Sequence, residues 1–191
     1  MKILSLDSSQ NTQSFSVYNT EINDFLISES FSGRSSDLVE RLRAAFSSIN
    51  LNLKDLGLLA VNIGPGSFTG IRNALVISKT LVLELSLKLI TVNTFELMRF
   101  EHGVSEDSPI AIDAFKNNYF VSLNSNYLSN TDNFFAISTE FTIHKFKQEN
   151  LSKLIIEYLI HKKLLQSIED SSFDLDNLKP YYLREPSLGK K

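Results

Sequence analysis

Ile63-Gly64-Pro65-Gly66-Ser67-Phe68-Thr69-Gly70-Ile71-Arg72 follows an apolar run and opens a helical pattern. Three of its residues are glycines and one is proline. Glycine permits positive φ and close backbone approach, whereas proline fixes its own φ. The first turn of a helix exposes unpaired N–H groups and the positive end of the helix dipole, so such a loop can hold an anion. The loop built on Gly64, Pro65, Gly66 and Gly70 therefore either cradles a phosphate or only turns the chain.

Two common phosphate-binding patterns do not fit this loop. A Walker A loop ends in a lysine followed by serine or threonine, and here the corresponding end is Thr69-Gly70-Ile71, without a lysine. The dinucleotide-binding fingerprint spaces its glycines G-x-G-x-x-G, whereas this loop reads G-x-G-x-x-x-G. The sequence favours neither class of nucleotide-binding protein.

The order of predicted elements leaves one nucleotide-binding fold open. Alternation and turn residues predict three strands in an antiparallel meander, and apolar periodicity then predicts helices alternating with strands. The near-continuous apolar run before the loop predicts a central strand covered on both faces. This order is that of the actin-like ATPases. The predicted strands are 2–7, 14–18, 25–31, 56–63 and 87–92, and the predicted helices are 36–50, 69–85 and 94–100.

A polar, glycine-containing stretch at 101–108 predicts a boundary between two lobes, 1–103 and 104–191. We expect the tail, 178–191, to pack back on the first lobe. The second lobe is predicted to contain a hairpin, a further strand, a helix and a short terminal extension. The corresponding ranges are 110–115 with 119–124, 134–142, 151–165 and 180–183, and 124–133 is predicted to be a long loop.

Composition excludes several functional classes. The chain has 191 residues, no cysteine and a formal net charge of −3. The absence of cysteine rules out disulfides and thiolate chemistry, and we expect a cytoplasmic protein because no signal peptide or membrane-length apolar segment is present. No stretch is densely basic apart from Lys190-Lys191 at the tail, so a role in RNA chemistry would need a partner that supplies a basic surface.

Few residues suggest chemistry. Asp7 ends the first strand, where an actin-like fold places its first phosphate turn, but a lone aspartate at a strand end is more often a turn former or a helix-dipole partner than a magnesium site. His102, His144 and His161 fall in different predicted elements without the spacing of a metal site. We therefore predict no catalytic, metal or cofactor site, and keep an ATPase that uses Asp7 and the glycine loop as the alternative.

The helix predicted at 69–85 carries apolar residues on two faces. One broad face is suited to cover the sheet. Val76 and Leu83 fall on a second face beside Arg72, Lys79 and Thr80, and this face is either a set of scattered surface residues or a partner surface. The broad face consists of Ile71, Ala74, Leu75, Ile77, Leu81, Val82 and Leu85.

Five stretches together resemble the TsaB (YeaZ) family: the strand ending in Asp7, Gly33-Arg34-Ser35-Ser36, the glycine loop, Ala111-Ile112-Asp113-Ala114 and Pro180-Tyr181-Tyr182-Leu183-Arg184. The resemblance implies an α/β, two-lobed actin-like (ASKHA) fold with a reduced second lobe and no catalysis of its own. Ser35 stands where the family usually has histidine. Phe115–Asn118 stands where the family usually has a glycine-containing turn that carries an arginine or a similar residue.

The resemblance also implies partners. Members of this family bind and activate the catalytic subunit TsaD, and the ATPase TsaE joins the larger complex. The complex transfers a threonylcarbamoyl group to the adenosine beside the anticodon of tRNAs that read codons beginning with A. Binding of tRNA occurs only through the complex, and whether the isolated chain forms a homodimer stays open. The helices at 36–50 and 69–85 correspond to the pairing helices, and the glycine loop then serves to position the second. The predicted interface residues are Leu38, Arg41, Leu42, Arg72, Val76, Lys79 and Leu83.

Overall fold

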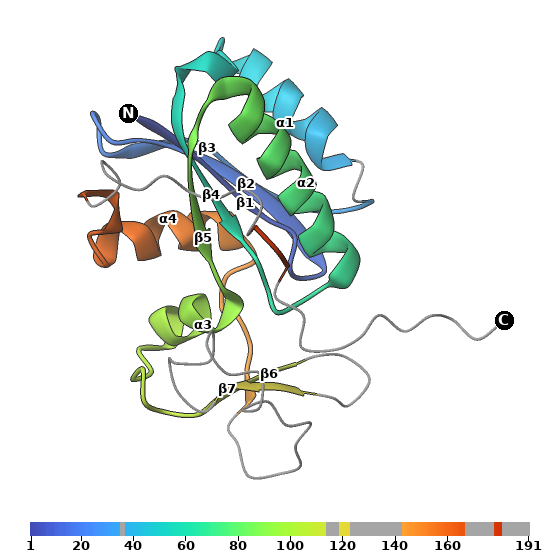
Figure 1. Ribbon diagram of the computed structural model, residues 1–191, viewed down its shortest axis with the longest axis vertical. Helices are drawn as coiled ribbons and strands as arrows, with labels where there is room; N and C mark the ends of the chain where they lie inside the picture. Colours follow the sequence, from blue (N-terminus) through green and yellow to red (C-terminus); the bar gives the residue numbers. More distant parts are fainter. Residues whose placement is uncertain (35–36, 114–118, 123–142, 167–177, 181–191) are drawn as a thin grey trace, which may run out of the picture.

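The computed structural model describes residues 1–34, 37–113, 119–122, 143–166 and 178–180. Its larger sheet has five strands in the order β3-β2-β1-β4-β5 (Figure 1). The first three strands form the predicted antiparallel meander, and β4 and β5 run parallel to β1. The bounds are β1 Lys2–Asp7, β2 Thr12–Asn19, β3 Asp24–Ser32, β4 Leu56–Asn62 and β5 Lys88–Val92.

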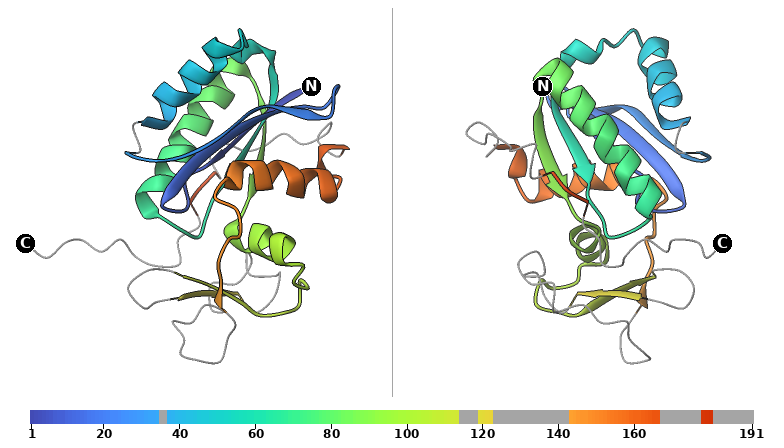
Figure 2. Two further views of the ribbon diagram at one scale, coloured as in Figure 1. Left: turned by 180° about the vertical axis from the view of Figure 1, so that it is seen from behind. Right: turned by 45° about the vertical axis from the view of Figure 1, so that its right-hand side comes forward.

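Helices cover both faces of this sheet (Figure 2). The helices α1 (Asp37–Ser48) and α2 (Phe68–Leu85) lie on one face, and α4 (Leu151–His161) crosses the other. Side chains of β4 alternate accordingly: Leu59 and Val61 join the core beneath α1 and α2, whereas Leu58 and Ala60 join the clusters that include α4. The prediction of a central strand buried on both faces is confirmed.

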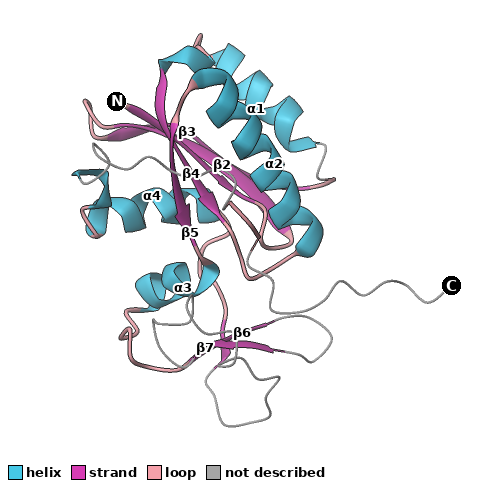
Figure 3. Ribbon diagram, in the orientation of Figure 1, coloured by secondary structure: helices cyan, strands magenta, loops and turns pink. Residues whose placement is uncertain are grey.

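A smaller sheet lies beyond α3 (Thr94–His102) in the order β7-β6-β8 (Figure 3). It consists of β6 (Ile110–Asp113), β7 (Tyr119–Ser122) and β8 (Ile143–His144). Helix α3 packs on it, since Phe95 and Met98 form a cluster with Ile110 and Ile112. The helix begins with a capping box of Asn93 and Glu96 and ends at Gly103, whose φ of +63° is a left-handed C-cap.

The structure departs from the predicted division at residue 103. Helix α4 falls in the range assigned to the second lobe, yet it packs on β1, β2 and β4 of the five-stranded sheet. Leu178 likewise lies in the core beneath α1 and α2, so the chain returns to the first lobe at the start of the predicted tail. The predicted helix 151–165 ends at His161, with a short 3-10 helix at Leu164–Gln166.

Some predictions lie outside the described residues. These are the strand at 134–142, the loop at 124–133 and residues 181–183 of the terminal extension. Strand β8 was not predicted, because two residues are too few for any periodicity to appear in the sequence. It forms by pairing in parallel with β6, from which it is about thirty positions distant in the chain.

Candidate functional site

The glycine loop connects β4 to α2 in a tight turn. Gly64 has a φ of +104°, which favours glycine, and the Gly64–Pro65 peptide is cis. Ser67 is the N-cap of α2, and its Oγ accepts a hydrogen bond from the N–H of Gly70 at 3.3 Å. Proline, glycine and serine each thus have a local task at the start of this helix.

The same loop lies directly on the β1–β2 turn. The backbone N–H of Ser67 donates to the carbonyl oxygen of Ser9 at 2.7 Å. A Cβ atom added at Gly66 would overlap the carbonyl of Ser9, and one added at Gly70 would overlap the carbonyl of Ser8. These two glycines are therefore required by close backbone approach, since any side chain would push α2 away from the turn.

A buried polar cluster lies beneath the loop, formed by Asp7, Ser9, Asn62 and Thr94. Asp7 Oδ1 accepts hydrogen bonds from Asn62 Nδ2 at 2.8 Å and from Ser9 Oγ at 2.9 Å, and Asp7 Oδ2 accepts one from the Ser9 N–H at 3.2 Å. Thr94 Oγ1 donates to the carbonyl of Pro65 at 2.6 Å. The cluster thereby joins the ends of β1 and β4, the loop and the start of α3.

Burial dominates the protonation of Asp7. Removal from water raises the pKa of its carboxyl to about 6, although the hydrogen bonds from Ser9 and Asn62 act in the opposite direction. Both carboxyl oxygens and the Ser67 N–H are engaged by the chain itself. Between the β1–β2 turn and the start of α2, the two stretches of backbone are therefore in direct contact.

A second feature is an apolar groove between α1 and α2, with a volume of about 730 Å³. Val76 and Leu83 on α2 are 64% and 67% exposed, and Val39 and Ile49 on or beside α1 are exposed as well. The lining side chains include one charged group, that of Arg43. The groove is lined by Val39, Leu42, Arg43, Phe46, Ser47, Leu51, Asn52, Leu53, Asn73, Val76, Ile77, Thr80 and Leu81.

Some of the predicted interface residues are accessible at the surface, whereas two of them are buried. Val76 and Leu83 are on the surface, Lys79 is half-buried beside them, and Arg41 and Arg72 lie over the rings of Phe31 and Phe68 at 4.4 and 4.1 Å. Leu38 does not fit the prediction, because it is fully buried in the core under α1 and no partner can reach it. Leu42 is also buried, though it lines the floor of the groove.

Sequence reasoning missed Val39, Phe46 and Arg43 as parts of this surface. Val39 directly follows Leu38 and therefore lies about 100° around the helix from it, away from the face that Leu38 buries. The available signal was the spacing of Val39, Arg43 and Phe46, which places them along one edge of the helix. That edge of α1 becomes one side of a groove only because α2 lies alongside it.

Two of the three histidines lie together. The rings of His102 and His144 are 4.8 Å apart in an edge-to-face arrangement, and His102 Nε2 is 2.9 Å from the carbonyl oxygen of Lys145. Burial, with lesser effects of His102 and Lys147, lowers the pKa of His144. Across the described ranges, no group of three or more histidine or acidic side chains is arranged to hold a metal ion. The ring contact and the His102 hydrogen bond join α3 to β8 and to the residue that follows it.

The strand order, with an antiparallel meander followed by parallel strands and helices on both faces, defines an α/β protein of the actin-like class. The structure of YeaZ from Pseudomonas aeruginosa has the same fold: its TM-score is 0.68 at 14% identity, over 95% of this chain and 99% of that one. Residues 33–133, just over half of the chain, match the family model "TsaD: tRNA N6-adenosine threonylcarbamoyltransferase". The chain belongs to the family that this model describes, on its TsaB/YeaZ branch.

Two curated relatives agree with this placement. The tRNA threonylcarbamoyladenosine biosynthesis protein TsaB of Buchnera aphidicola subsp. Acyrthosiphon pisum is 28% identical over 117 residues, which are 60% of this chain and 53% of that protein. Its counterpart from subsp. Schizaphis graminum is 27% identical over 96 residues, 50% of this chain and 46% of that protein. The chain thus spans about half the length of the curated relatives it matches.

No helix within the described ranges is both long enough and apolar enough to cross a bilayer.

Proposed function

We propose that this protein is a non-catalytic partner subunit that docks through the α1–α2 groove on a catalytic subunit of the TsaD type. The observation that carries the proposal is the exposed apolar surface of Val39, Val76 and Leu83 around a groove that α1 and α2 leave open. Contiguous exposed apolar surface of this kind marks interaction sites in soluble proteins. The groove, with a volume of about 730 Å³, has room for apolar side chains of a partner.

The names of the relatives indicate the biological process. Both matched Buchnera proteins bear names that assign them to tRNA threonylcarbamoyladenosine biosynthesis. We propose the same process for this chain, with TsaD as the transferase that modifies the adenosine beside the anticodon and TsaE as the ATPase of the larger complex. The net charge of −3 fits a subunit that reaches tRNA only through its partners.

The alternative is a small ATPase or phosphotransferase that uses Asp7 and the glycine loop. Phosphoryl transfer needs cationic groups and metal ligands around the phosphates. In this chain the Asp7 carboxyl is buried and bonded to Ser9 and Asn62, and the Ser67 N–H bonds to the backbone of Ser9. These contacts favour the partner subunit over the enzyme.

The test is co-purification of the chain with the TsaD subunit of the same organism. Replacing Val76 and Leu83 by aspartate places one charge in the lining of the groove and another two turns further along the exposed side of α2, and we expect the double variant to abolish the complex. Both side chains are exposed, so the monomer stays folded, as circular dichroism and thermal unfolding would show. The matched control is Ile22→Asp, at a side chain that is 60% exposed in the β2–β3 turn, which should leave the complex intact.

A complex that forms equally well with the double variant would refute this docking surface. Magnesium-dependent hydrolysis of ATP by the isolated chain, abolished by Asp7→Asn, would favour the enzyme instead.

A further inference from the structure

The lining of the α1–α2 groove contains one charged side chain, and the described part of the chain does not neutralise it. This side chain is that of Arg43, which is exposed on the α1 side of the groove. Its guanidinium forms no ion pair, hydrogen bond or ring contact with any residue in the described ranges. Glu40, three residues earlier on α1, is exposed and does not pair with it. The groove therefore presents a cation that is available to a partner.

The other arginines in the described ranges each have a partner within the chain. Arg34 pairs with Asp37, Arg41 and Arg72 lie over the rings of Phe31 and Phe68, and Arg99 donates to the carbonyl oxygen of Ser108. A guanidinium holds its donors in a planar fork, from which a carboxylate can accept two hydrogen bonds at once. Within these ranges, Arg43 is the arginine whose donors remain available for such a carboxylate.

Two hydroxyls in the groove are already engaged by their own helices. Ser47 Oγ donates to the carbonyl oxygen of Arg43 at 3.0 Å, and Thr80 Oγ1 donates to that of Val76 at 2.9 Å. Apolar side chains make most of the remaining lining, and apolar contact alone discriminates poorly between partners of similar shape. Charge complementarity is what gives an interface its specificity, so Arg43 is the residue best placed to select the occupant.

A second copy of the chain does not offer the complementary group in its own groove. Two copies that dock groove to groove about a two-fold axis bring the same surface together from both sides. The lining holds one cation and no carboxylate, since Glu40 and Glu84 are exposed on the two helices outside it. Self-docking would therefore cover two guanidinium groups without an acceptor in the groove, and covering an unpaired charge costs binding free energy.

We propose that Arg43 selects the occupant of the groove. That occupant is a different protein, which places apolar side chains beside Leu42 and Val76 and an aspartate or glutamate against the Arg43 guanidinium. The inference rests on the proposed function, because it specifies the partner that docks in the same groove. With Val39 one turn away and Val76 across the groove, the ion pair is partly enclosed by apolar groups and is screened less by salt than an open surface pair.

The test measures binding of the TsaD subunit of the same organism to Arg43 variants of the full chain by surface plasmon resonance. Arg43→Gln removes the charge and should raise the Kd about thirtyfold or more, and Arg43→Glu should raise it further. Arg43→Lys keeps the charge without the planar fork and should lie in between. Most of the change should be faster dissociation, because an enclosed ion pair acts after contact, whereas a charge that only steers the approach alters the association rate.

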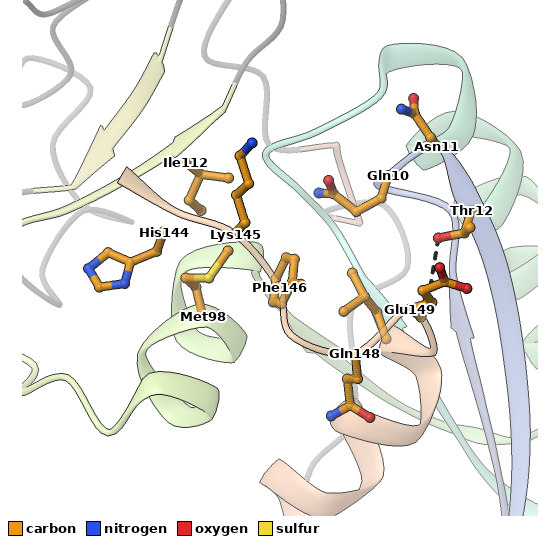
Figure 4. Close-up of a pocket in the computed structure, with 11 residues that line it drawn as sticks. Gln10, Asn11, Thr12, Met98, Ile112, His144, Lys145, Phe146, Gln148 and Glu149 are labelled. Carbon is orange, nitrogen blue, oxygen red and sulfur yellow. Dashed lines mark hydrogen bonds between the residues drawn. The ribbon is translucent and has the colours of Figure 1, made fainter. Parts of the chain in front are cut away.

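The matched control is Lys145→Glu, which changes the net charge as much as Arg43→Glu does. Lys145 is exposed and lines a different pocket, between the β1–β2 turn and the segment that joins β8 to α4 (Figure 4). This variant should leave the dissociation rate unchanged. Arg43 and Lys145 are both exposed, so the variants stay folded, as circular dichroism would show.

Sedimentation of the isolated chain, at concentrations well above the Kd for TsaD, tests the exclusion of a second copy. We expect a monomer. A dimer that the Val76→Asp and Leu83→Asp double variant dissociates would overturn the proposal, because the groove would then accept its own surface.

Two outcomes with TsaD separate this proposal from the proposed function. If the unmodified chain and Arg43→Glu bind TsaD equally well, or differ only in association rate, the selection by Arg43 is refuted and the docking surface stands. If TsaD does not bind the unmodified chain at all, the proposed function fails, and this proposal fails with it.

Discussion

At the scale of the residue, burial raises the pKa of the Asp7 carboxyl, whereas its hydrogen bonds lower it. Burial prevails and raises its pKa to about 6 from an ordinary value of 3.8. The folded state therefore holds the proton more tightly than the unfolded chain does. The contribution of Asp7 to stability is complete below the unfolded pKa and is lost as the pH rises through the folded pKa.

The variant Asp7→Asn tests this. Asparagine does not ionise, so the unfolding free energy of the unmodified protein should fall relative to that of the variant between about pH 4 and pH 7, by about 3 kcal/mol. Urea denaturation of both proteins across that range measures the difference. The variant also loses an acceptor for the Ser9 N–H, which adds a constant offset and leaves the slope unchanged. A difference that is independent of pH would contradict the assignment.

At the scale of the element, the position of helix α2 depends on the residues at its amino-terminal end. Ala is favoured over Gly in helices by about 1 kcal/mol, so Gly70 within the first turn needs a reason. The reason is the carbonyl of Ser8, which a Cβ would overlap. The position of α2, and with it that of Val76 and Leu83, depends on this contact.

The variant Gly70→Ala should therefore destabilise the protein by about 2 kcal/mol, although intrinsic helix propensity predicts the opposite sign. Chemical denaturation gives the unfolding free energy. Thr80→Ala, at an exposed position of the same helix, is the control and should change stability by less than about 1 kcal/mol. If Gly70→Ala proves neutral or stabilising, the close approach of α2 to the β1–β2 turn is not a stability determinant.

At the scale of the whole molecule, α4 ties the carboxyl half of the chain to the first sheet. The contact is polar and buried around Ser152: its Oγ lies 2.8 Å from Ser16 Oγ and donates to Asn150 Oδ1 at 2.7 Å, and its carbonyl accepts from Ser5 Oγ at 2.8 Å. The backbone N–H of Ser152 donates to Ser14 Oγ at 2.9 Å. Residues of β1, β2 and the start of α4 thus meet at one serine.

Removal of this hydroxyl should weaken the assembly of the molecule. Ser152→Ala leaves Ser16 and Asn150 with fewer partners in a buried site, and we expect a loss of about 1 to 2 kcal/mol in unfolding free energy. The control is Ser47→Ala, at an exposed hydroxyl on α1, with little change. Because α4 packs on the first sheet, the loss should appear within a single cooperative transition. A separate early transition in the variant would mean that α4 is not part of the same cooperative unit.

Elements with strong local patterns were predictable. The meander, α1, α2 and β4 agree with the structure to within about two residues, because alternation and helical periodicity depend on neighbours in sequence. The position of α4 was not predictable, since its Ser152 contacts Ser5 and Ser16 through pairs separated by more than one hundred residues. The groove shows the same limit. The exposure of Val76 and Leu83 follows from the pattern of one helix, whereas Arg43 becomes a lining residue only because α1 and α2 lie side by side.

The β1–β2 turn has neighbours on two sides. The carbonyls of Ser8 and Ser9 lie against the start of α2. Gln10, the next residue, lines a pocket together with Lys145, Phe146 and Glu149. One short piece of backbone is thus a common support for α2 and for the pocket. The alignment of the outer surface of α2 therefore depends on the same few peptide groups that border this pocket.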